Sequence, residues 1–140
     1  MFPNADNAMV VRTDFENQDA WNAVVKLIRA PVHLAGEAFY AHVDLMDNAE
    51  YRNLSTAEVI AAVPPDYKYS FLFIVDRHTL SSEEFPVLVV DLNGSDHQSF
   101  RANPTQIQGI ENNLSTANMD FAEFAEAVDD NGTFRGFGAS

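Results

Sequence analysis

The sequence contains no cysteine, which excludes a disulfide framework, a thiolate metal site and a cysteine nucleophile. Basic residues are scarce as well: 8 Lys and Arg stand against 21 Asp and Glu, and the formal net charge is −13. A surface of this sign repels phosphate backbones, so we expect no nucleic-acid partner. The N-terminus lacks the basic and apolar regions of a signal peptide, and no apolar run approaches the roughly 20 residues of a membrane span. These absences predict a soluble, cytoplasmic protein without a membrane partner.

Motifs for several common chemistries are also missing. The four histidines fall in different predicted elements without the spacing of a zinc site, and there is no glycine-rich phosphate loop or nucleophilic serine elbow. We therefore expect no cofactor. Enzymatic activity is left undecided at this point, with a non-catalytic role favoured.

The chain does have a large apolar and aromatic content. Of its 140 residues 46% are hydrophobic, and 11 are phenylalanine. A chain of this length is typical of one domain with its own core. We predict a single domain over residues 1–140, with a loose N-terminal arm at 1–8 and a loose C-terminus at 138–140.

Apolar patterning predicts strands and helices in alternation. Residues 39–46 alternate apolar and polar side chains, as in a half-buried strand, whereas residues 71–75 and 87–90 are apolar throughout, as in central strands. Further strands are expected at 9–13 and 99–102, the last one after a hairpin turn at Asn93-Gly94. Helices are expected between the first three strands and over residues 103–132.

These elements predict an α/β fold, with α+β as the alternative. We expect a single mixed sheet of about five strands, with helices packed on its faces and a C-terminal helix pair. Helical crossovers make the first three strands parallel. Only about ten residues join 71–75 to 87–90, too few for a parallel crossover, so the last two strands are antiparallel.

Three helix starts show the pattern of a capping residue followed three positions later by a residue that can bond back. These structural caps are Ser55 with Glu58, Asn103 with Gln106, and Asp120 with Glu123.

Aspartates follow the three strands expected to be parallel. Asp14, Asp47 and Asp76 would lie at the same carboxyl edge of the sheet, followed by Arg77 and His78. A carboxylate cluster of this kind could hold Mg²⁺ or Ca²⁺, which prefer oxygen ligands. The alternative is that each aspartate caps a helix or turn where a strand ends.

An asparagine-rich segment separates the two C-terminal helices. Asn112, Asn113 and Asn118 are polar side chains able to bond exposed backbone groups. The segment is interpreted either as a recognition surface or as a tight corner between helices.

Three parts of the chain together resemble a known family: Arg12-Thr13-Asp14-Phe15, Val89-Val90-Asp91-Leu92 and the run from Phe100 to Phe137. They are similar to an uncharacterised family of small acidic proteins from actinobacteria and fungi, classed as a domain of unknown function. The resemblance implies no activity, substrate or catalytic residues.

Three classes of function remain. The first is a non-catalytic intracellular protein-binding domain, such as an acidic inhibitor or immunity-type partner of a basic protein. The second is a metal-assisted hydrolase or phosphoryl-transfer enzyme that uses the aspartates at the sheet edge. The third is a small-ligand binding or sensor domain. The sequence decides neither the partner nor the oligomeric state.

Overall fold

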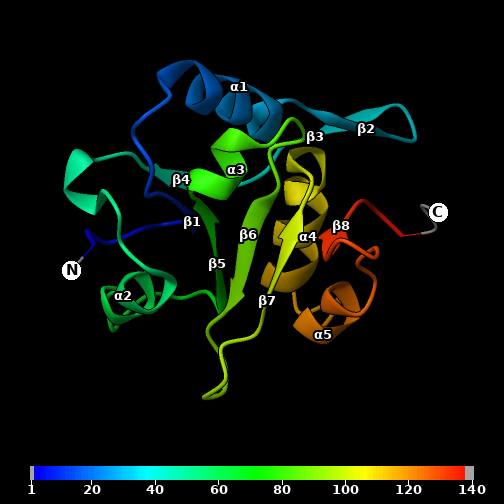
Figure 1. The fold of residues 1–140 in the computed structure, drawn as a ribbon. Coiled ribbons are helices and arrows are strands. Elements are labelled where there is room, and N and C mark those ends of the chain that lie inside the picture. The colour runs from blue at the N-terminus through cyan, green and yellow to red at the C-terminus, as the bar shows by residue number, and fades with distance from the viewer. Residues whose placement is uncertain (1, 138–140) are drawn as a thin grey trace.

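A six-stranded mixed sheet forms the centre of the fold in the computed structural model, which describes residues 2–137 (Figure 1). Its strand order is β4-β1-β5-β6-β7-β8. Strands β4, β1 and β5 run parallel, β6 is antiparallel to both of its neighbours β5 and β7, and β8 lies parallel to β7. The strand bounds are Ala8–Arg12 (β1), Val43–Met46 (β4), Phe71–Val75 (β5), Val87–Asp91 (β6), Ser99–Ala102 (β7) and Thr133–Phe134 (β8).

Helices cover both faces of this sheet, so the predicted α/β fold with three parallel strands and an antiparallel extension is confirmed. The prediction of about five strands missed β8, which is only two residues long. The helices are α1 (Gln18–Arg29), η1 (Ala49–Tyr51), α2 (Thr56–Ala61), α3 (Arg77–Ser81), η2 (Pro104–Gln106), α4 (Ile107–Ser115) and α5 (Phe121–Ala125). No helix among residues 2–137 has the length and apolar character needed to span a membrane.

Each face of the sheet has its own core, because successive strand residues point to opposite sides. On one face, Val10 and Phe73 pack with Trp21 of α1, Ile110 of α4 and Phe124 of α5. The opposite core contains Met9, Val11, Leu72 and Val59 of α2, together with Phe2. The second face is thus covered by short elements and by the N-terminal segment.

Phe2 corrects the expectation of a loose arm at residues 1–8. Its side chain is buried, and its N–H donates to the carbonyl of Ala62. The Tyr69 hydroxyl donates to the carbonyl of Asp6, and β1 already begins at Ala8. An aromatic side chain that closes the second core holds residues 2–7 against the body. The predicted loose C-terminus, 138–140, and residue 1 lie outside the described residues.

The predicted strand at 39–46 is wrong in its first half. Residues 43–46 form β4, but Glu37–Phe39 forms β3, which pairs with β2 (Val32–Leu34) in a separate hairpin. The break has a physical cause: the buried carboxylate of Glu111 on α4 accepts the His42 N–H at 2.8 Å. The alternating pattern therefore runs across two different elements.

Two further local predictions need correction, the hairpin turn at Asn93-Gly94 and the capping box of Asn103 with Gln106. The β6–β7 connection spans residues 92–98, and of the Asn93-Gly94 pair only Gly94 has a positive φ, 77°. Asn103 Oδ1 accepts the Thr105 N–H at the start of η2, as a cap should, but the Asn103 N–H donates to the carbonyl of Phe134 and not to the Gln106 side chain. Gln106 instead lies beside Gly136, so the predicted Asn103–Gln106 capping box is wrong.

The other two predicted caps are present. Ser55 Oγ accepts the Glu58 N–H, and the Glu58 carboxylate accepts the Ser55 N–H, which starts α2. At α5 the Glu123 carboxylate accepts the Asp120 N–H.

Candidate functional site

The three predicted aspartates follow strands that lie side by side. The order β4-β1-β5 places Asp47, Asp14 and Asp76 after neighbouring parallel strands. Asp91 pairs with Phe71, the first residue of β5, and so lies at the opposite edge as expected.

Arginines bind the carboxylates of two of these three aspartates and the backbone carbonyl of the third. Arg12 reaches Asp47 at 3.1 Å, and Arg101 forms two hydrogen bonds to Asp76, at 2.9 and 2.8 Å. Asp14 is buried, and its carbonyl oxygen accepts the Arg12 Nε–H. Within residues 2–137 no group of three or more acidic or histidine side chains is placed to hold a metal ion. The geometry favours the structural interpretation of these aspartates over a shared metal site.

Asp76 also starts a helix that the sequence analysis missed. Its Oδ1 accepts the Thr79 N–H at 3.0 Å, and the Thr79 hydroxyl accepts the Asp76 N–H in return. Helix α3 therefore begins directly after β5, with Arg77 and His78 exposed in its first turn.

His78 borders a polar cleft of about 390 Å³ between α3 and the β7–β8 edge. Arg101 and Arg135 line the same cleft. Both arginines are already paired, Arg101 with Asp76 and Arg135 with Asp129 and Glu84. A ligand at this cleft would have to compete with these internal pairs.

The asparagine-rich segment forms a corner closed by its own hydrogen bonds. Asn113 Nδ2 donates to the carbonyl of Gly109, and Asn118 Nδ2 donates to Asn113 Oδ1 at 2.7 Å. The Asn113 carbonyl accepts the backbone N–H groups of Asn118 and Met119. Asn112 is exposed, and its carbonyl accepts the Thr116 hydroxyl. These contacts account for the segment as a tight corner.

A second concavity, which we call the acidic cleft, lies between η1 and α2 and has a volume of about 460 Å³. Apolar side chains form most of its wall, and two carboxylates stand at it. Its lining residues are Phe2, Glu50, Tyr51, Leu54, Glu58, Ala61 and Ala62.

Local capping positions the two sides of the acidic cleft. Asn48 accepts the Glu50 N–H and starts η1, while the Ser55–Glu58 box starts α2. Between them Asn53 has a φ of 62° and donates its N–H to the carbonyl of Thr13, which anchors the turn to the end of β1. The bond from the Phe2 N–H to Ala62 fixes the remaining wall.

The electrostatics of the acidic cleft favour a cation. Hydrogen bonds from the Ser55 backbone and side chain lower the pKa of Glu58, so its carboxylate stays ionised. Partial burial and the charge of Glu50 raise the pKa of Tyr51, which stays a neutral hydroxyl. Phe2 and Tyr51 meet edge to face at 4.6 Å between ring centroids. Neither Glu50 nor Glu58 has an ion-pair partner among residues 2–137.

The sequence analysis identified Glu58 only as a cap and missed Glu50, Tyr51 and Phe2. One local feature could have indicated η1, the helix that carries Glu50 and Tyr51: Asn48 is a typical helix-capping residue and lies just after β4. The apolar lining of the cleft could not be predicted, because Phe2 belongs to the segment that was expected to be loose.

Comparison with known families gives a match over most of the chain. The family described as "Domain of unknown function (DUF6924)" matches residues 7–137. No curated protein matches the chain.

Proposed function

The chain belongs to the DUF6924 family, and we propose that it is a non-catalytic, intracellular protein-binding domain whose acidic cleft takes a basic segment of another protein. In this role it would act as an acidic partner or inhibitor of that protein.

The main support for this proposal is that the carboxylates of the acidic cleft have no ion-pair partners among the described residues. In the polar cleft both arginines are already paired with carboxylates, whereas Glu50 and Glu58 stand beside apolar surface with no cation of their own among residues 2–137. Lysine and arginine have an apolar stem and a charged head. The stem of such a side chain could pack on Phe2, Tyr51 and Leu54 while its head reaches the two carboxylates.

The charge of the whole chain supports the same partner. A formal net charge of −13 attracts basic surfaces over a distance and speeds their association at low salt. Charge alone does not distinguish one acidic surface from another, so the test has to separate the cleft from the rest of the molecule.

We expect Glu50→Lys to weaken the binding of a basic peptide about tenfold, because an exposed attraction of up to about 1 kcal/mol becomes a repulsion of similar size. The Glu50 side chain makes no hydrogen bond within residues 2–137, so the fold should tolerate the change. The probe is a fluorescein-labelled peptide of alternating arginine, leucine and lysine, followed by fluorescence anisotropy at low and physiological salt.

The matched control is Glu126→Lys, which makes the same charge change at the C-cap of α5, a helix on the opposite side of the sheet from α2 (Figure 1). It should weaken peptide binding far less than Glu50→Lys does. Equal weakening by the two variants would mean that only long-range charge attracts the peptide, and the cleft would lose its proposed role.

A further inference from the structure

Tyr51 gives the acidic cleft an aromatic surface next to its carboxylates. Glu50 and Tyr51 are consecutive residues of η1, and both line the cleft together with Glu58 of α2. Phe2, the other aromatic residue of the lining, is only 3% exposed, whereas Tyr51 is partly exposed. The Tyr51 ring is therefore the aromatic surface that the cleft offers to a partner.

The position of the Tyr51 ring is set by contacts within the chain. The Tyr51 N–H donates to the carbonyl of Asn48, and the Tyr51 carbonyl accepts the Leu54 N–H, so the backbone is held on both sides. The buried Phe2 ring packs edge to face against it, with an angle of 71° between the ring planes. A surface that is ordered in advance loses less conformational freedom when a partner binds.

The cations of the described residues leave this part of the cleft open. Arg52 follows Tyr51 directly, but its guanidinium carbon lies 5.7 Å from the ring centroid of Phe15, and it forms no ion pair within residues 2–137. One oxygen of the Glu58 carboxylate accepts the Ser55 N–H, which orients the group, and the other oxygen makes no hydrogen bond within the same residues. The ring and the carboxylates are thus available to a cation from another molecule.

An aromatic ring beside carboxylates favours arginine over lysine. The guanidinium group is planar and weakly hydrated, stacks on aromatic faces and presents its donors in a rigid fork. The lysine ammonium is a compact and strongly hydrated charge, so it loses more hydration in a cleft with apolar walls. A guanidinium that lies on the Tyr51 ring still has N–H groups at its edge that can donate to a carboxylate.

The chain binds one of its own arginines by the same combination. The guanidinium carbon of Arg12 lies 4.2 Å from the ring centroid of Phe15, and its Nη1 donates to Asp47. We infer that the acidic cleft is selective for arginine, whose guanidinium stacks on Tyr51 and pairs with the cleft carboxylates. The inference rests on the proposed function, because it names the residue type that anchors the basic segment in the same cleft.

Peptides of equal charge test this selectivity. One fluorescein-labelled peptide alternates arginine with leucine, and a second has lysine at every arginine position. We expect the wild-type protein to bind the arginine peptide about fivefold more tightly in fluorescence anisotropy at physiological salt, because only the guanidinium gains the full stacking contact. A third peptide with citrulline, which keeps the shape of arginine without its charge, should show no binding.

Substitutions at Tyr51 separate stacking from charge. Tyr51→Leu should lower the affinity for the arginine peptide to that for the lysine peptide, and change the latter by less than about twofold. Tyr51→Phe keeps the ring and should keep the preference, so the test does not depend on one variant. Glu50→Lys should instead weaken the binding of both peptides, because it changes the charge of the cleft. Circular dichroism and thermal melting check that each variant is folded.

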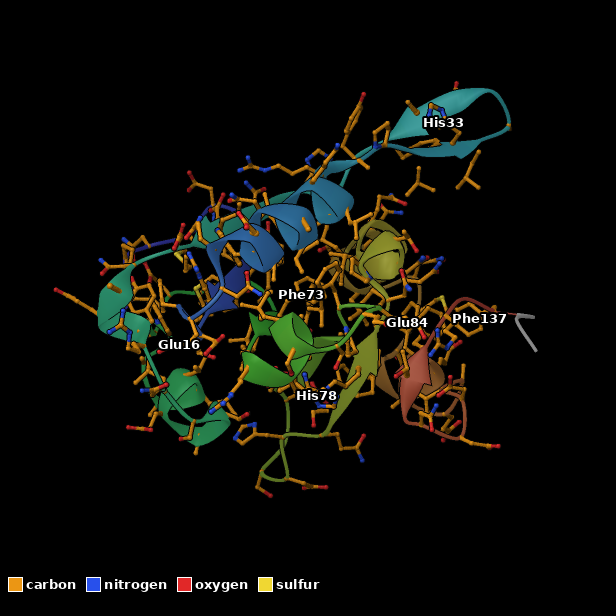
Figure 2. The ribbon with its side chains drawn as sticks, turned by 45° about the horizontal axis from the view of Figure 1, so that its top comes forward. Glu16, His33, Phe73, His78, Glu84 and Phe137 are labelled. Atoms are coloured by element: carbon orange, nitrogen blue, oxygen red, sulfur yellow. The ribbon has the colours of Figure 1, made fainter. Side chains whose placement is uncertain are left out.

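Tyr40→Leu is the matched control for Tyr51→Leu. Tyr40 follows β3 and is 55% exposed. The hairpin of β2 and β3, which carries His33, lies at the opposite end of the molecule from α2 in both views (Figures 1 and 2). The control should leave the affinities for both peptides unchanged.

Nuclear magnetic resonance detects the stacking contact directly. The ring signals of Tyr51 are identified by their absence from the spectrum of Tyr51→Phe. We expect the arginine peptide to shift these signals and to show nuclear Overhauser effects between arginine side-chain protons and the ring. The lysine peptide at equal saturation should shift them much less.

Equal affinity of the wild-type protein for the arginine and lysine peptides would overturn the inference, and so would a preference for arginine that Tyr51→Leu leaves intact. The proposed function would stand after either result if Glu50→Lys still weakens peptide binding more than Glu126→Lys does. If these two charge variants weaken it equally, or if neither basic peptide binds, the cleft has no role and both proposals fail.

Discussion

Replacing Arg12 with alanine should lower the free energy of unfolding by about 3–5 kcal/mol, because the change leaves a cavity and removes the partner of a buried carbonyl. Arg12 is the last residue of β1, and its side chain is 3% exposed, whereas the side chain of its partner Asp47 is 42% exposed. The arginine is therefore the buried member of the pair. Its loss affects the packing around it as well as the charge.

The contacts of Arg12 explain the size of the effect. Its Nε–H donates to the carbonyl of Asp14, and its Nη1 donates to Gln18 and Asp47. The guanidinium carbon lies 4.2 Å from the ring centroid of Phe15 and 4.9 Å from that of Trp21. Alanine would leave a cavity and an unsatisfied buried carbonyl, each costing about 1–3 kcal/mol.

Lysine at position 12 provides the graded test. It keeps the charge but lacks the planar fork of donors that arginine places among these partners, so Arg12→Lys should lose about half as much stability as Arg12→Ala. Arg77→Ala is the control, because Arg77 is exposed and forms no ion pair within residues 2–137. Urea denaturation followed by Trp21 fluorescence measures all three. A loss for Arg12→Ala no larger than that of the control would show that the buried guanidinium does not stabilise the fold.

Strands were predictable from the sequence where the order of apolar and polar side chains along the chain matches the burial of the strand's two faces. The central strand β5 reads as an uninterrupted apolar run because both of its faces are buried, and its antiparallel partner β6 followed from the short connection between them. The Ser55–Glu58 cap was predictable because both halves of its bonding are local.

Elements that depend on distant contacts were not predictable. The bond from the His42 N–H to Glu111, 69 residues away, divides one apparent strand into β3 and β4. The hairpin turn contains Ala35 at a positive φ, a position where sequence rules expect glycine or asparagine. Helix α3 is short, and its cap uses Thr79 where the capping pattern expects Glu or Gln.

In the candidate site, too, the features set by local sequence were predictable and those set by distant contacts were not. Helical crossovers predicted that Asp14, Asp47 and Asp76 share a sheet edge, but their partners Arg12 and Arg101 are set by packing across strands. The acidic cleft needs Phe2 beside α2, a contact between segments about sixty residues apart. Local patterns therefore indicated which carboxylates lie near one another, and the tertiary contacts determine which of them remain available to a partner.

Replacing Asp76 with alanine should lower the free energy of unfolding by about 3 kcal/mol, because two roles are lost together. The helix cap of α3 is worth about 1 kcal/mol. The half-buried bidentate pair with Arg101 should account for about 2 kcal/mol, less than a fully buried pair because the two side chains are 19% and 26% exposed. Asp76→Asn keeps an oxygen for the Thr79 N–H and removes the charge, so it should lose only about 2 kcal/mol.

The pH dependence separates the ion pair from the cap. Burial by itself raises the pKa of Asp76, but the hydrogen bonds from Arg101 and Thr79 and the charge of Arg101 hold it below its ordinary value. Because the folded pKa is depressed, the stabilisation is present above the unfolded pKa of about 3.9 and is lost as pH falls through the folded pKa. The stability difference between wild type and Asp76→Asn should be constant near neutral pH and shrink below about pH 4. Denaturation with urea at a series of pH values measures it, with Asp66→Asn as the exposed control. A difference that stays the same at low pH would show that the amide substitution acts through packing and not through the charge pair with Arg101.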